Sequence, residues 1–216
     1  MHIQPEFRPE DFPNKLGLLP LSSSDIESQV SGYSLSFPQT RNSKVERGLK
    51  FPQFVRAFYN FIYKYGKMPT QAEYFEFYLK INAAYFRDAR YSPIIIEGLK
   101  ARVFRTYPSL VRDFHFNKKL SEVLPDYEIV YNSELDLEFD IDTLLIRDGR
   151  YWAANLYTQT RRANIAREWK ENRHEHFSNV AYIEFPVKLD DNNKFGEFFL
   201  YGENELNTLL KYIHEK

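Results

Sequence analysis

Acidic side chains gather in one short stretch of this chain of 216 residues. Between Glu122 and Asp148 there are nine acids and a single base. From Glu134 to Asp142, reading ELDLEFDID, every second residue is acidic, and this period of two predicts a strand with all its carboxylates on one face. Such a face either meets water throughout or binds a divalent cation through its last acids, Asp142 together with Asp140.

A mildly basic stretch follows between residues 161 and 176. Apolar residues at helical spacing predict a helix from Arg162 to about His176. Its cationic side chains are candidates for contacting nucleic-acid phosphates: Arg161, Arg162, Arg167, Lys170 and Arg173. The alternative is that they form the solvated side of an amphipathic helix.

The elements expected around these two stretches alternate between helix and strand. The predicted order is a helix over 109–124, strands over 127–131, 134–146 and 150–158, the helix over 162–176, a strand over 179–186, a short strand over 196–201 and a closing helix over 203–213. Asp148 and Gly149 fit a tight hairpin turn between the second and third strands. This order predicts an α/β protein.

The preceding part of the chain is expected to be helical. Residues 1–48 carry five prolines and predict an irregular arm whose apolar side chains, such as Phe7 and Leu16, pack on the body or on a partner. Residues 49–106 predict a small helical domain, in which helices over 52–65 and 70–83 make a helix-turn-helix plausible. Pro108 is expected to break the chain, so that a third domain occupies residues 107–216.

Bulk composition excludes several classes of protein. Lysine and arginine total 29 against 30 acids, so no global basic field supports unaided binding to DNA. There is no cysteine, which removes disulfides, thiolate metal sites and thiol nucleophiles. No run of about 20 apolar residues is present, so we expect a cytoplasmic protein without a membrane segment.

The order of elements from Ser109 to Pro186 resembles the restriction-endonuclease-like fold of the PD-(D/E)xK nucleases. The resemblance implies an αβββαβ core, with a central mixed sheet flanked by helices, that binds Mg or Mn. Asp142, in FDIDTLLI, falls on the family's aspartate position, and Asn155 falls on the position of its second acid. Tyr157 falls on the position of the catalytic lysine, which is a departure from the family's pattern.

The resemblance also implies roles for residues on the two helices. Glu122 is the candidate for the family's acid on the opening helix, with Asp113 as the alternative, and Lys170 could replace the missing lysine. The run from Ser109 to Phe114 looks similar to the opening helix of the endonuclease subunit of heteromeric transposons, whose acid falls on Val111 here.

Three functions remain open from the sequence. The first is a DNA-binding or DNA-processing protein of a mobile element, phage or defence system, working with a protein partner and cleaving phosphodiesters with a metal ion. The second is a catalytically inactive relative that keeps the nuclease-like fold as a binding or assembly subunit. The third is a structural protein whose aromatic helices and arm dock on a partner.

Overall fold

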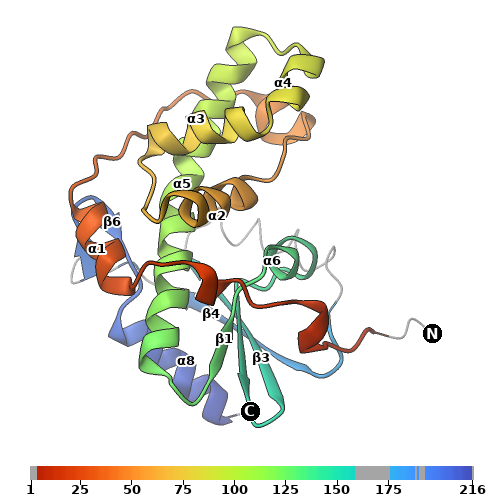
Figure 1. Cartoon of the computed structure of the whole chain (residues 1–216), viewed down its shortest axis with the longest axis vertical. Coiled ribbons are helices and arrows are strands. Elements are labelled where there is room, and N and C mark those ends of the chain that lie inside the picture. Colours follow the sequence, from red (N-terminus) through yellow and green to blue (C-terminus); the bar gives the residue numbers. More distant parts are fainter. Residues whose placement is uncertain (1–3, 159–175, 188, 190–192, 216) are drawn as a thin grey trace. The chain divides into compact units, whose positions relative to one another are not determined.

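The computed structural model describes residues 4–158, 176–187, 189 and 193–215, which form two compact units (Figure 1). The helical unit consists of Leu19–Arg112 and Lys194–Phe198. The sheet unit consists of the described parts of Met1–Leu18, Asp113–Asn193 and Phe199–Lys216. The expected mixed α/β class is confirmed. None of the helices described is both long and apolar enough to cross a membrane.

The helical unit contains α1 (Ser23–Ser31), η3 (Lys44–Gly48), α2 (Phe54–Tyr65), α3 (Gln71–Ile81), α4 (Ala83–Ala89) and most of α5 (Pro93–Val123). The helices predicted over 52–65 and 70–83 are confirmed as α2 and α3. Gly66 ends α2 in the left-handed conformation, with a φ of 63°. The prediction of an irregular arm is wrong at α1, because Ser22 and Asp25 form a capping box that starts a helix there.

The start of α3 is fixed by a second capping box. The Thr70 hydroxyl accepts a hydrogen bond from the Glu73 N–H, and the Glu73 carboxylate accepts one from the Thr70 N–H. Burial raises the pKa of Glu73, but the Lys67 ammonium at 2.5 Å and the Thr70 hydrogen bonds outweigh it, so the net effect is a lowered pKa. The charged carboxylate is therefore the form that caps the helix.

Pro108 does not break the chain, which corrects the sequence prediction. It lies inside α5, a continuous helix of 31 residues. A proline at this position cannot donate to the carbonyl four residues earlier, that of Phe104. The Gln71 side chain donates to this carbonyl instead, at 2.9 Å, and Gln71 is itself buried. A side chain from α3 thus replaces the missing main-chain hydrogen bond, which sequence periodicity cannot reveal.

The sheet unit is built on a four-stranded sheet in the order β1-β2-β3-β4. Its strands are β1 (Glu128–Val130), β2 (Thr143–Arg147), β3 (Arg150–Thr158) and β4 (Val180–Val187). The first three pair antiparallel, and β4 lies parallel to β3. Asp148 and Gly149, with φ of 51° and 72°, make the predicted tight turn between β2 and β3. The helix α8 (Glu203–Glu215) packs beside β4. A small ribbon that pairs β5 (Lys194–Phe195) with β6 (Phe198–Phe199) belongs to the helical unit except for Phe199.

The long acidic strand predicted over 134–146 is wrong in its first half. Residues Ser133–Phe139 form a helix, α6, whose first turn is capped by the Asn132 side chain at 2.8 Å from the Glu134 N–H. Leu135 and Phe139 are four residues apart, a spacing that fits period two and also the 3.6 residues of a helical turn. They pack inward, while the acids lie at angles around the helix. The acids of this segment therefore do not share one strand face.

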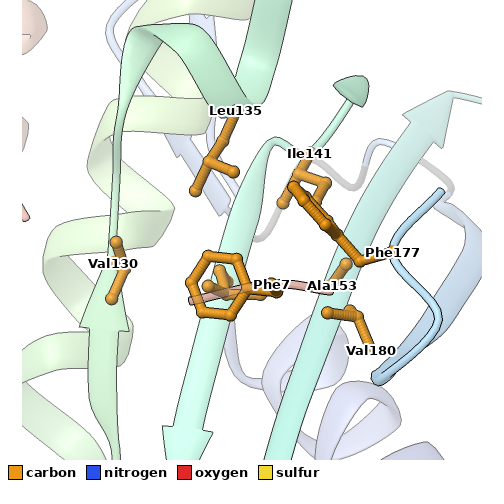
Figure 2. Packing of buried hydrophobic residues seen from close by; sticks show 8 residues of the cluster. Phe7, Val130, Leu135, Ile141, Ala153, Phe177 and Val180 are labelled. Carbon is orange, nitrogen blue, oxygen red and sulfur yellow. The ribbon is translucent and has the colours of Figure 1, made fainter. Parts of the chain in front are cut away.

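One face of the sheet carries a core cluster that includes the amino-terminal segment (Figure 2). Phe7 is 2% exposed and packs among Val130, Ala153 and Val180, with its ring 5.5 Å from that of Phe177. Two short turns, η1 (Pro9–Asp11) and η2 (Leu16–Leu18), carry the segment onward. The expected packing of these apolar residues on the body is thus confirmed for Phe7 and Leu16, whereas Leu18 is exposed.

Candidate functional site

Polar side chains cross the sheet beside the point where β2 begins. Asn155 on β3 is paired in register with Glu184 on β4. Asp142 directly precedes β2, opposite Asn155, and its N–H donates to the Asn155 Oδ1 at 3.2 Å. Residues in register on neighbouring strands share a face of the sheet. Asp142, Asn155 and Glu184 therefore form one polar row, with two carboxyl groups flanking an amide.

A buried asparagine on α5 ties the helix to this row. Asn117 is fully buried, and its Nδ2 donates to the Asp113 carbonyl at 3.0 Å and to the Asp142 carbonyl at 3.3 Å. Because both partners are carbonyls, the nitrogen of the amide is the atom that faces them. The Asn117 Oδ1 is buried and has no hydrogen-bond partner among the described residues. A neutral oxygen acceptor thus remains in the interior next to the polar row.

The predicted pair of metal ligands is separated by a change of structure. Asp142 lies in the polar row and is half-buried. Asp140 takes the left-handed conformation that ends α6, with a φ of 54°, so the regular alternation that placed both carboxylates on one strand face is absent. Sequence reasoning thus put Asp142 beside Asn155, as the structure has it, but on a false premise about the preceding residues.

The two candidate acids of α5 lie in different environments. Asp113 is half-buried and four residues before Asn117, so the two share a side of the helix. Glu122 is exposed, and its charge acts on Lys118, one turn earlier. Burial lowers the pKa of Lys118, Glu122 opposes that shift, and the Lys118 ammonium donates to the Leu16 carbonyl at 3.2 Å. Asp113 is therefore on the helix side that reaches the polar row.

The predicted phosphate-contacting side chains lie outside the described residues: Arg161, Arg162, Arg167, Lys170 and Arg173. The helix expected over 162–176 falls in the same gap, apart from His176. Tyr157, which the resemblance to the nucleases aligns with a lysine, is half-buried on β3 opposite Pro186.

Two residues of the candidate site were missed by sequence reasoning. Glu184 stands in AYIEFPV, a strand whose pairing partner could not be read from the sequence. Asn117 stands in a helical run of mixed polarity, and only its burial distinguishes it. An isolated acid inside an apolar strand was the one available signal for Glu184.

The donor set of the site consists of hard oxygen atoms. Within the described ranges, no three side chains of His, Cys, Asp or Glu lie together as a metal-binding group. Asp142 and Glu184 supply two carboxylates, and Asn155 supplies an amide oxygen. Mg²⁺ is commonly held by one or two carboxylates together with water and phosphate, so this set is chemically suitable. Comparison of the chain with protein-family models, curated proteins and solved structures finds no match.

Proposed function

We propose that the sheet unit is a restriction-endonuclease-like module that acts on DNA, with Asp142, Asn155 and Glu184 as its cation-binding row. The polar row is the observation that carries the proposal, since it brings two carboxyl groups and an amide together on one row of the sheet. The order α5, β1, β2, β3 and β4, with the last strand parallel to the third, supports the same fold.

Asp142 and Glu184 would hold a magnesium or manganese ion, with the Asn155 Oδ1 as a neutral ligand. A bound ion supplies a water of lowered pKa and stabilises charge that develops on a phosphate. The protein's own contribution is to place the carboxylates. The Asn117 amide fixes the Asp142 main chain through the carbonyl, and the Asn155 amide fixes it through the N–H.

Cation binding tests this proposal directly, without requiring activity. Titration of the full chain with Mn²⁺ by calorimetry is expected to show a site that is lost in Asp142→Asn and weakened in Glu184→Gln. Glu134→Gln, at an exposed acid of α6, is the matched control and should bind as wild type. Cleavage of duplex, branched and single-stranded DNA with Mn²⁺ is then compared across the same variants. Equal binding by wild type and Asp142→Asn would remove the proposal.

A noncatalytic module is the second candidate, and two observations favour it. The Asn155 Oδ1 already accepts a hydrogen bond from the Asp142 N–H, as a purely structural amide would. Tyr157 carries no positive charge where the family has its lysine. This candidate predicts that Asn155→Ala lowers the free energy of unfolding by about 1–3 kcal/mol, while no cation binds and no DNA is cut.

A further inference from the structure

The outward side of α2 carries exposed cations. Arg56, Asn60, Tyr63 and Lys64 are exposed. Asn60 follows Arg56 by four residues, and Tyr63 and Lys64 follow Asn60 by three and four, so they form a single stripe, which we call the α2 face. The helix contains no acid at all. Its stripe is therefore cationic, with an amide and an aromatic ring in its middle.

Two other helices of the helical unit, α1 and α3, have acids on their exposed sides. The exposed residues of α3 include Glu76 and Lys80, whose charges cancel, and those of α1 include Asp25. Neither Arg56 nor Lys64 takes part in an ion pair within the part of the chain that the structure describes. Their charge is available to an anionic partner.

The tyrosines at the end of α2 are exposed to an unusual extent. Tyr63 is 65% exposed and Tyr65 is 45% exposed, in a unit where Tyr74, Tyr78 and Tyr107 are fully buried. The Tyr65 ring rests against Phe61 at 4.6 Å and Phe77 at 5.8 Å, which holds it in place at the surface. Rings that are presented in this way offer flat faces for stacking.

We propose that the α2 face binds single-stranded DNA. Cations that contact phosphates, beside aromatic rings on which bases stack, are the combination by which proteins hold unpaired strands without reading sequence. A duplex keeps its bases stacked on one another, so the Tyr63 ring would gain nothing from it. The choice of DNA rests on the proposed function of the sheet unit. The α2 face itself requires no cation site, and this separates the two proposals.

Fluorescence anisotropy with a labelled oligothymidine strand, in EDTA, tests the proposal on the full chain. Tyr63→Ala is expected to weaken binding by about fivefold or more, the effect of losing one stacked base, and Tyr63→Phe to retain it. Removing Arg56 and Lys64 together should lower the slope of log affinity against log salt by about 1.4, or about 0.7 for each phosphate contact. Glu134→Gln, at an exposed acid outside both proposed sites, should bind as wild type.

Matched controls lie elsewhere on the surface. Tyr212→Ala removes another exposed tyrosine, from α8, and Lys80→Ala removes an exposed lysine from α3, and both should leave affinity unchanged. The proposal is overturned if wild type does not bind, if Tyr63→Ala binds as tightly as wild type, or if a duplex competes equally. Tighter binding of an RNA strand of the same sequence would overturn the assignment to DNA. Loss of strand binding with intact Mn²⁺ binding would leave the cation site standing.

Discussion

The two units secure their irregular segments with different side chains. In the helical unit, tyrosine hydroxyls donate to main-chain carbonyls outside the helices: Tyr33 to Met68, Tyr78 to Pro52 and Tyr107 to Pro69. Tyr74 donates to the carbonyl of Phe54, at the start of α2. In the sheet unit, asparagine amides serve instead. Asn179 accepts from the Phe7 N–H at 2.7 Å and donates to the Phe7 carbonyl at 3.0 Å. Asn14 likewise accepts from the Tyr131 N–H and donates to the Ile129 carbonyl.

The difference follows from what each segment lacks. Loops between helices leave carbonyls without donors, and a tyrosine satisfies one of them while its ring fills the core. A segment lying beside a strand needs both a donor and an acceptor, which an amide side chain provides in one group. The abundance of tyrosine in this chain is therefore partly a hydrogen-bonding device of the helical unit.

The largest expected difference between the two units is their stability at alkaline pH. Burial raises the pKa of Tyr74 and Tyr107 well above the ordinary value of 10.0 and also raises that of Tyr78. The unfolded chain releases these protons near pH 10, so the free energy of unfolding falls as pH rises above about 10. We expect helical circular dichroism to be lost at lower pH than the tryptophan emission changes, since both tryptophans lie in the sequence of the sheet unit. In Tyr107→Phe the helical transition should move to higher pH. Coincident transitions in wild type would contradict the prediction.

Removal of one asparagine amide should release the amino-terminal segment. Asn179→Ala leaves the N–H and carbonyl of Phe7 without their partners and is expected to lower the free energy of unfolding by about 1–3 kcal/mol. Urea denaturation measures the loss, and hydrogen exchange of the Phe7 amide locates it. Asn60→Ala, at an exposed position of α2, should change stability by less than about 0.5 kcal/mol. Unchanged protection of Phe7 in Asn179→Ala would show that the amide does not hold the segment.

The substitute hydrogen bond at Pro108 can be tested by a double-mutant cycle. Gln71→Ala should destabilise the chain by about 1–3 kcal/mol, because it leaves the Phe104 carbonyl buried without a donor. Pro108→Ala restores the main-chain donor, so the loss from Gln71→Ala should be smaller in that background, with a coupling of about 0.5–3 kcal/mol. Additive losses in thermal denaturation would mean that Gln71 does not compensate for the proline.

The smallest effect is expected at the cap of α3. Thr70→Ala should cost about 1 kcal/mol, and this loss should shrink at acid pH. The pKa of Glu73 is lowered in the folded chain, so its contribution is present above the ordinary value of 4.5 and is lost as pH falls through the folded value. Ser22→Ala at the capping box of α1 gives a matched comparison. A Thr70→Ala loss that stays constant with pH would contradict a role for charged Glu73.

The sequence correctly predicted those elements whose ends are fixed by capping or turn residues close by in the chain. Gly66, the Thr70 capping box and the Asp148-Gly149 turn each act within a few residues, and all three lie where the sequence placed them. The predictions of a chain break at Pro108 and of a strand in place of α6 were wrong for different reasons. The proline's missing donor is supplied from a residue 33 positions away from the carbonyl that needs it, whereas Leu135 and Phe139 satisfy both periods at once.

The residues of the candidate site could be predicted only in part by the same reasoning. Asp142 and Asn155 could be placed together because one hairpin joins them. Glu184 and Asn117 lie far along the chain from this hairpin. The position of Glu184 depends on which strand pairs with β3, and that of Asn117 on which side of α5 is buried. Neither the strand that pairs with β3 nor the buried side of α5 could be predicted from the sequence of this chain alone.

Phe7 packs among β-strands that are synthesised more than a hundred residues later, and this constrains the order in which the chain can fold. During translation, nearly all of the helical unit leaves the ribosome before Val180 is synthesised. The Phe7 side chain therefore stays exposed to water until the strands that bury it have formed. A truncated variant that begins after Phe7 would expose the apolar side chains of the sheet that Phe7 covers. If this variant were insoluble, the exposed core would explain it, without any loss of binding to a partner.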